Sequence, residues 1–279
     1  MLETMRKTML CTIAALLLLP ACSKKNPAPV EDTPAAAPAA APAPAAGQPA
    51  AEAAAVEAGG DDYQGGDAAG GGTITGTVSY SGSEKDSKVT ITKDEATCCS
   101  ACKVKEKMAG AIVVAAGKLA NAVVYLPDVK KGKKMDKATV TVNNDGCEFS
   151  PHVAIGYKGA NLAAKNSDPV LHNTHLFLAQ GNKDLVNIAL PTQGQVVEKP
   201  LKKPGVVSVK CDAHEWMQAY VFVATNPYAV VTGKNGSFSL EGVPAGEHAV
   251  KVWHEKFGEK DGKVTVTAGG SAKLDFAFN

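Results

Sequence analysis

The sequence carries almost no net charge and has only one long hydrophobic run. Its 29 Lys and Arg residues nearly balance its 28 Asp and Glu residues, which leaves a formal net charge of +1. Proteins that bind nucleic acids usually carry a basic patch or stripe, so we expect no nucleic-acid partner. The hydrophobic run at residues 9–19 is too short to span a bilayer, and no other segment predicts a transmembrane helix.

The N-terminus has the pattern of a secretory signal. Two basic residues precede the hydrophobic run, and the run ends in Leu-Pro-Ala-Cys-Ser at residues 19–23. Because this end resembles a bacterial lipobox, residues 1–21 are expected to be a lipoprotein signal peptide and Cys22 the lipidated residue. An ordinary signal peptide with an incidental cysteine is the alternative. The resemblance implies a lipid anchor in the bacterial cell envelope, and Ser23 favours the outer membrane, facing the periplasm or the cell surface.

Residues 22–72 are rich in Ala, Pro and Gly and contain almost no large apolar residue. Such a segment cannot bury enough apolar surface to form a core, so we expect a disordered tether. A flexible chain of this length reaches on the order of 40 Å, at about 5–6 Å × √n. The expected order is therefore a lipid anchor, a tether and a folded part.

From residue 73 onward, short runs of alternating or β-branched residues are separated by Gly, Pro, Asn and Asp. The expected strands are 73–80, 88–92, 122–126, 138–142, 206–210, 220–223, 237–240, 248–253, 263–266 and 272–278. Strands at this spacing are typical of β-sandwiches. The sequence therefore predicts an all-β fold.

Four residues have the types and the spacing of a copper ligand set. His172 lies about forty residues before the segment Cys211-Asp-Ala-His214-Glu-Trp-Met217. Two imidazoles, one thiolate and one thioether are the ligands of a blue-copper electron-transfer site. Cys211 ends an apolar strand, so a loop of a few residues must return His214 and Met217 to the same ion before the next strand begins.

This segment resembles the cupredoxins, the type 1 blue copper proteins, and among them the amicyanin and plastocyanin kind. The likeness covers roughly residues 138–224 and implies a Greek-key β-sandwich at residues 136–225. It implies one type 1 copper ion held by His172, Cys211, His214 and Met217. The His214 ring edge is expected to face solvent and to serve as the port for electrons.

Several residues near these ligands are expected to support the site without binding copper. The same resemblance implies that Asn173 fixes the ligand loops through hydrogen bonds. His175 lies on the opposite strand face from His172 by alternation, so it is expected to be structural or to support the ligands. Trp216 is expected either to form an apolar wall beside His214 or to pack beneath the loop. His152 is a weaker candidate for a hydrogen bond near the site.

The segments on either side of the copper ligands resemble the carboxypeptidase regulatory-like, or transthyretin-like, β-sandwich. The motifs are Gly-x-Val at 76–78, Ala-x-Val-x-Leu at 122–126 and Gly-x-Phe-x-Leu-x-x-Val-Pro-x-Gly at 236–246. Because these motifs belong to one domain in that family, residues 73–135 and 226–279 are expected to form one sandwich with the cupredoxin inserted between them. Two consecutive domains are the alternative. His248 and His254 are expected to be surface or core residues of this sandwich.

Four cysteines remain once the signal, the lipidation candidate and the copper thiolate are set aside: Cys98, Cys99, Cys102 and Cys147. In an oxidising periplasm an even remainder predicts disulfides, and we expect Cys147 to pair with one of the other three. The alternative is a second copper site built from Cys98, Cys99 and Cys102, because clustered thiolates suit Cu(I).

The small numbers of histidines, cysteines and methionines exclude several classes of copper protein. Six histidines without a His-x-His pair are too few for the trinuclear cluster of a multicopper oxidase, and the ligand loop lacks the second cysteine of a binuclear copper centre. After removal of the signal only three methionines remain, which disfavours a methionine-rich copper chaperone. No residue pattern supports hydrolysis, so we expect no enzyme. The expected protein is a membrane-tethered carrier of single electrons with a transient redox partner. The alternative is a surface lipoprotein that binds copper or carbohydrate without redox function.

Overall fold

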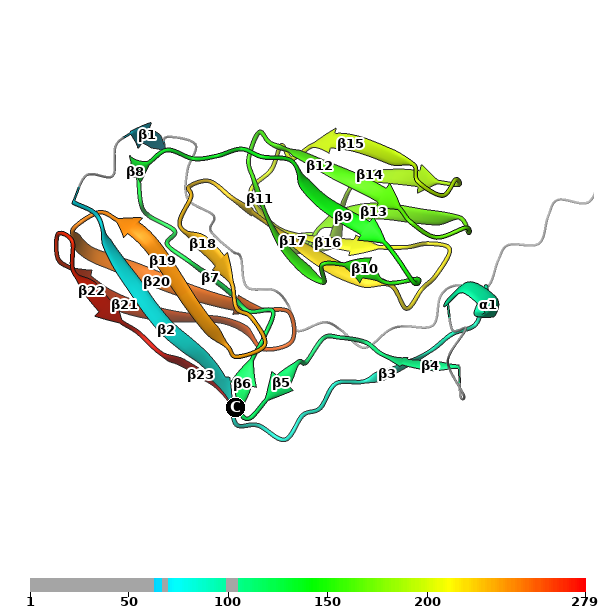
Figure 1. Cartoon of the computed structure of the whole chain (residues 1–279), viewed down its shortest axis with the longest axis horizontal. Coiled ribbons are helices and arrows are strands. Elements are labelled where there is room, and N and C mark those ends of the chain that lie inside the picture. The colour runs from blue at the N-terminus through cyan, green and yellow to red at the C-terminus, as the bar shows by residue number, and fades with distance from the viewer. Residues whose placement is uncertain (1–62, 67–69, 99–104) are drawn as a thin grey trace, which may run out of the picture. The chain divides into compact units, whose positions relative to one another are not determined.

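The computed structural model describes residues 63–66, 70–98 and 105–279. The expected signal peptide, most of the expected tether and the cysteines Cys22, Cys99 and Cys102 lie outside these residues. Strands dominate the described part of the chain, which confirms the all-β class (Figure 1). In this part no helix has the length and apolar character needed to cross a membrane.

One sandwich consists of strands β9 to β17 in two sheets. The first sheet has the order β10-β9-β12-β15, with β9 at Val140–Asn144, β10 at Phe149–Ser150, β12 at Asn161–Asn166 and β15 at Val196–Pro200. The second has the order β11-β17-β16-β13-β14, with β11 at Val153–Tyr157, β13 at His172–Leu178, β14 at Lys183–Leu190, β16 at Gly205–Lys210 and β17 at Gln218–Ala224. Side chains of both sheets meet in a copper-sandwich core that includes Val142, Leu162, Val209 and Val221.

A second sandwich combines strands from both sides of residues 136–225. One sheet has the order β18-β7-β20-β21, with β7 at Val123–Tyr125, β18 at Ala229–Val231, β20 at Gly246–His254 and β21 at Gly258–Val266. The other has the order β19-β2-β6-β5, and β22 and β23 also pair with β2. Its strands are β2 at Gly72–Tyr80, β5 at Val114–Ala115, β6 at Lys118–Leu119, β19 at Ser237–Val243, β22 at Ser271–Lys273 and β23 at Phe276–Phe278.

The core of this second sandwich, the flank core, contains residues from before position 130 and after position 227 only. Ile74 and Val78 of β2 meet Phe238, Leu240 and Phe278 there. Strand pairing of this kind is what an insertion of the copper segment requires, because β2 and β7 find their partners beyond residue 225. The exact domain boundaries stay a prediction.

Strand β17 is buried on both faces, which explains its nearly continuous apolar sequence. Val221 and Val223 face the copper-sandwich core, whereas Tyr220 and Phe222 belong to a cluster that also contains Tyr125 and Trp253 of the flanking strands. The ring centroids of Tyr125 and Phe222 are 4.6 Å apart, and those of Tyr220 and Trp253 are 5.3 Å apart. Aromatic contacts therefore join the two sets of strands.

The end of the expected tether is folded. Strand β1 (Gln64–Gly66) pairs in parallel with β8 (Lys131–Lys133), although both β1 and Tyr63 lie within the expected tether at 22–72. Tyr63, a large side chain in this otherwise small-residue segment, packs edge-on against Tyr228 at 6.5 Å and donates a hydrogen bond to the Lys133 carbonyl. The ring contact and this hydrogen bond hold the segment beside β8.

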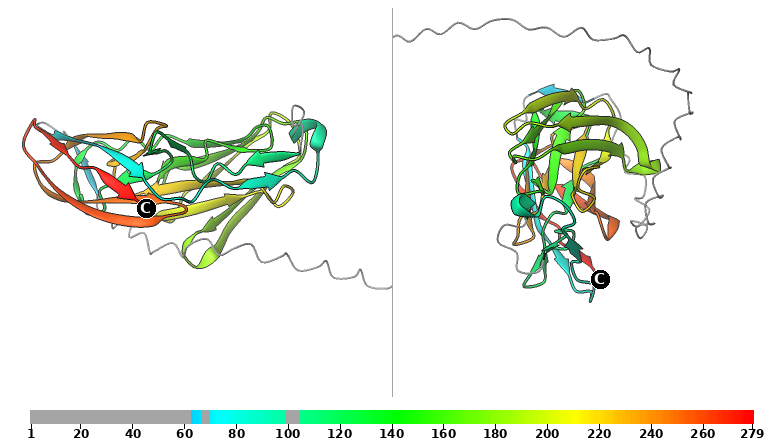
Figure 2. Two further views of the ribbon diagram at one scale, coloured as in Figure 1. Left: turned by 90° about the horizontal axis from the view of Figure 1, so that it is seen from below. Right: turned by 90° about the vertical axis from the view of Figure 1, so that its right-hand side faces the viewer.

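A hairpin that we call the arm, residues 88–98 and 105–108, extends from the second sandwich (Figures 1 and 2). It comprises β3 (Lys88–Thr90), a single helical turn α1 (Glu95–Cys98) and β4 (Glu106–Met108), with β3 and β4 paired in antiparallel fashion. Ile91 and Cys98 of the arm are buried in the copper-sandwich core. A disulfide between Cys98 and Cys147 confirms the pairing expected for Cys147. It also removes Cys98 from the alternative second copper site.

Candidate metal centre

The two sheet strands β13 and β16 and the turn after β16 bring the expected ligands to one end of the copper sandwich. His172 is the first residue of β13, and Cys211 directly follows β16, which pairs with β13 in antiparallel fashion. The turn then places His214 and Met217 before β17, and the Met217 N–H donates to the His214 carbonyl at 2.9 Å. Strand pairing thus brings His172 close to Cys211, which is 39 positions further along the chain.

Three donor atoms converge. The Cys211 Sγ lies 3.8 Å from the Nδ1 of His172 and 3.6 Å from the Nδ1 of His214, and all three donors lie within 4.8 Å of one another. The His172 and His214 side chains are fully buried, and Cys211 is a free, buried thiol. Met217 is also buried and belongs to the same core as Cys211. These residues have the soft and borderline donors that copper prefers, so they fit the ion.

Each imidazole is held from its far side by a carboxylate. The His172 Nε2 donates to Asp168 Oδ2 at 2.9 Å, and the His214 Nε2 donates to Asp94 Oδ2 at 3.0 Å. With the proton on Nε2, each Nδ1 keeps a free lone pair directed toward Cys211. The described residues thus hold both rings in the tautomer that a metal ligand needs.

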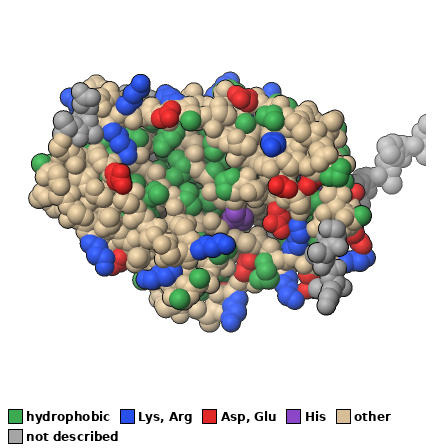
Figure 3. Space-filling model, viewed as in Figure 1, with side chains coloured by type: hydrophobic (Ala, Val, Ile, Leu, Met, Phe, Trp, Pro, Cys, Tyr) green, Lys and Arg blue, Asp and Glu red, His purple; other side chains and the backbone are tan. Residues whose placement is uncertain are grey.

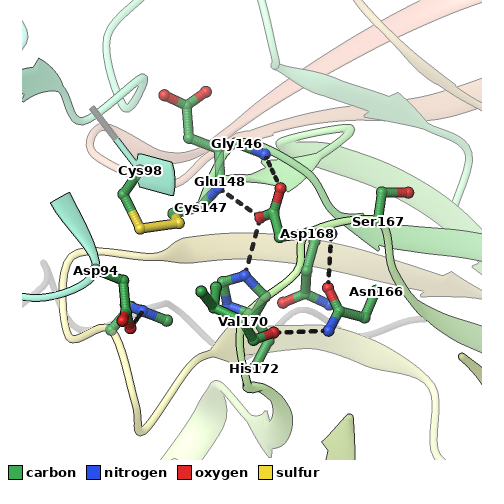
Figure 4. A network of polar contacts seen from close by, with 12 residues as sticks. Asp94, Cys98, Gly146, Cys147, Glu148, Asn166, Ser167, Asp168, Val170 and His172 are labelled. Carbon is green, nitrogen blue, oxygen red and sulfur yellow. Dashed lines mark hydrogen bonds and ion pairs between the residues drawn. A yellow bond between two sulfur atoms is a disulfide. The ribbon is translucent and has the colours of Figure 1, made fainter. Parts of the chain in front are cut away.

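Asp168 is itself fixed by backbone groups (Figure 4). Its two carboxylate oxygens accept the N–H groups of Gly146 and Cys147, each at 2.8 Å. Its own N–H donates to the Asn166 side chain at 2.9 Å. Sequence reasoning missed this residue, although its position four residues before His172 was a usable signal.

Burial sets the protonation of the ligands. It lowers the pKa of His172, although the Asp168 hydrogen bond acts in the opposite direction, so the ring stays neutral. Burial also raises the pKa of the Cys211 thiol, against hydrogen bonds from the N–H groups of Asn173, His214 and Ala213. Because the thiolate is the metal ligand, binding of a metal ion here should release a proton.

The expected solvent port at His214 is wrong for this chain. The His214 side chain has no exposed surface, because Asp94 covers its Nε2 and Trp216 packs edge-on against the ring with centroids 5.0 Å apart. The Trp216 Nε1–H donates to the Cys147 carbonyl at 3.1 Å, which ties the ligand loop to the disulfide. The expected wall of Trp216 beside His214 is therefore present, but it closes the ring edge together with the arm.

The remaining candidates lie around the ligands in different ways. The Asn173 N–H donates to Cys211 Sγ at 3.3 Å, and its side chain donates to Asn187. His175 points away from the ligands and bonds Asp212 and Asp184. Burial works to lower the pKa of His175, but the hydrogen bonds to the two carboxylates outweigh it and raise the pKa.

His152 does not join the metal centre. Its Nε2 pairs with the buried carboxylate of Glu255, which directly follows β20 of the second sandwich. It thus links the two sets of strands instead of supporting a copper ligand.

Comparisons with known proteins agree with the two resemblances drawn from the sequence. Residues 215–279 match the family model of the carboxypeptidase regulatory-like domain. A comparison with the curated proteins found no matching sequence.

Among solved structures, a copper-containing nitrite reductase from Thermus scotoductus is similar, with 24% identity and a TM-score of 0.28 over 33% of this chain and 23% of that chain. A purple cupredoxin from Nitrosopumilus maritimus has 23% identity and a TM-score of 0.27, over 31% of this chain and 99% of that chain. Amicyanin from Paracoccus versutus has 16% identity and a TM-score of 0.27, over 36% of this chain and 96% of that chain. The cupredoxins are thus among the proteins that this chain resembles. The likeness is too weak to indicate a function, which is inferred below from the donor atoms of the site.

Proposed function

We propose that this chain binds one type 1 copper ion through His172, Cys211, His214 and Met217 and carries single electrons. The observation that supports this best is the convergence of two imidazole Nδ1 atoms on one buried free thiol. When bound, the copper ion supplies one-electron exchange between Cu(I) and Cu(II). We propose a carrier and not an enzyme.

The chain's own residues prepare the site for electron transfer. Paired strands hold His172 and Cys211 in place, and the Asn173 N–H is directed at the Cys211 sulfur, where it stabilises the thiolate. Asp168 and Asp94 fix the two rings. Full burial of both rings keeps water from acting as a further ligand. Ligands held this firmly need little rearrangement when the charge at the site changes.

The proposed partner is a redox protein that docks transiently, and the proposed location is the bacterial cell envelope with a lipid on Cys22. Figure 3 shows acidic and basic side chains mixed on one face of the molecule, without a large area of one sign. A short-lived contact is compatible with such a surface.

The test is the visible absorption spectrum of the copper-loaded full chain. An intense thiolate-to-copper charge-transfer band is expected in the wild type and should be absent in Cys211→Ser and His172→Gln. His175→Gln is the matched control, because it removes a histidine of the same strand that does not face the thiol, and it should keep the band. Circular dichroism should show the same strand content in all four proteins.

Copper bound stoichiometrically without the band would contradict electron carriage and support the alternative of a non-redox copper-binding surface protein. A band that survives Cys211→Ser would show that another group is the ligand.

A further inference from the structure

An acidic residue from the arm reaches the metal centre of the other sandwich. The Asp94 Oδ2 accepts the hydrogen bond of the His214 Nε2 at 3.0 Å, although the two residues are 120 positions apart. Asp94 lies beside α1, whereas Asp168 reaches His172 from a different segment (Figure 4). The Asp94 side chain is 46% exposed, so its outer edge faces water while one oxygen covers the ring.

The backbone around Asp94 fixes the position of its carboxylate. Asp94 has a positive φ of 47°, and its carbonyl accepts the N–H groups of Thr97 at 2.9 Å and Cys98 at 2.8 Å, which starts the turn α1. The last residue of that turn, Cys98, is covalently joined to Cys147, whose carbonyl binds Trp216. Asp94 is therefore held against His214 by a disulfide that lies four residues further along the chain, at Cys98.

The base of the arm is closed as well. The Asp86 carboxylate accepts the N–H groups of Gly110, Ala111 and Ile112 at 2.8, 3.0 and 3.2 Å. Between base and tip, Ile91 is buried in the copper-sandwich core with 1% exposure. Anchors at the base, middle and tip leave the carboxylate little freedom to move away from the ring.

We propose that Asp94 is a positioning residue of the metal centre that lowers its reduction potential; this rests on the proposed copper function. A carboxylate that accepts the Nε2–H of a ligand histidine makes the opposite nitrogen a stronger donor. The stronger donor and the added negative charge favour the doubly charged ion over the singly charged one. The second sandwich, through its arm, thereby tunes the redox centre of the first.

The experiment measures the reduction potential of the copper-loaded full chain by redox titration. Asp94→Asn keeps an acceptor oxygen but removes the charge, and it should shift the potential upward. Glu95→Gln is the matched control, because it removes the same charge from the neighbouring residue, whose carboxylate pairs with Lys105 and not with His214. It should leave the potential close to wild type. Asp94→Glu keeps the charge, so its reduction potential should lie closer to that of the wild type than the potential of Asp94→Asn does.

Nuclear magnetic resonance of the Cu(I) form supplies the second readout. The His214 Nε2–H should be protected from solvent exchange in the wild type and in Asp94→Asn, and should lose that protection in Asp94→Ala. Intact mass under non-reducing conditions confirms that the Cys98–Cys147 disulfide persists in every variant.

Equal potentials for wild type and Asp94→Asn, or equal shifts for Asp94→Asn and Glu95→Gln, would overturn the proposed role of Asp94. The proposed copper function would not be affected by either result. A wild type without the charge-transfer band would overturn the copper function and this inference together, so the two failures are distinguishable.

Discussion

A buried histidine of the second sandwich should make the protein sensitive to mild acid. His254 ends β20 with no exposed surface, and its Nε2 has no hydrogen-bond partner within the described part of the chain. Its Nδ1 accepts the N–H of Lys256 at 3.3 Å, and its ring stacks on Phe257 at 4.8 Å. Burial, with smaller contributions from the charges of His152 and Lys256, lowers the pKa of His254 to about 4.

The sign and size of the effect follow from proton linkage. Because the folded pKa lies below the unfolded value of 6.5, the unfolded state binds more protons as the pH falls between these values. Stability is therefore full above about pH 6.5, decreases as the pH falls and levels off below about pH 4. The expected loss of unfolding free energy from this residue is about 2 kcal/mol between pH 7 and pH 5 and approaches about 3 kcal/mol at lower pH.

The substitution His254→Phe removes the titrating group and keeps a ring to stack on Phe257. Guanidinium unfolding of wild type and variant, followed by circular dichroism at pH 8, 7, 6 and 5, gives the free energy at each pH. The difference between the two proteins should stay constant from pH 8 to pH 7 and then move by about 2 kcal/mol in favour of the variant by pH 5. If the variant keeps the pH dependence of the wild type, the acid sensitivity does not come from His254.

Two further predictions concern the axial ligand and the architecture. Met217→Leu should keep the visible band and raise the reduction potential, because loss of a weak thioether donor destabilises Cu(II) more than Cu(I); loss of copper or a lower potential in the titration would assign Met217 another role. A shortened chain in which residue 135 is joined to residue 226 by a Gly/Ser turn should unfold cooperatively in denaturant, because the flank core draws on no residue in between. An unfolded shortened chain together with a stably folded fragment 137–279 would favour two domains in series.

Much of the metal centre could be predicted from the sequence because its geometry is local. Cys211, His214 and Met217 share one turn, and the strand before it is buried over residues 205–209. Their side chains can converge only if the chain reverses there, so residue type and spacing already define the donor set. The all-β class has a similar origin, since alternation along each strand reflects which face is buried; β2 shows it over nine residues.

Tertiary structure alone decided what covers His214. The sequence around Asp94 gives no sign that this residue contacts a copper ligand. Its contact with His214, 120 positions away, forms only because the arm packs against the other sandwich. The choice of Cys98 as the partner of Cys147 depends on the same packing, since cysteine spacing leaves several pairings open. The packing of the arm and the Cys98–Cys147 disulfide together explain why the His214 ring is covered. The sequence by itself thus determined which atoms can bind the metal and placed Asp168 near His172, and long-range packing determined that Asp94 meets the far side of the His214 ring.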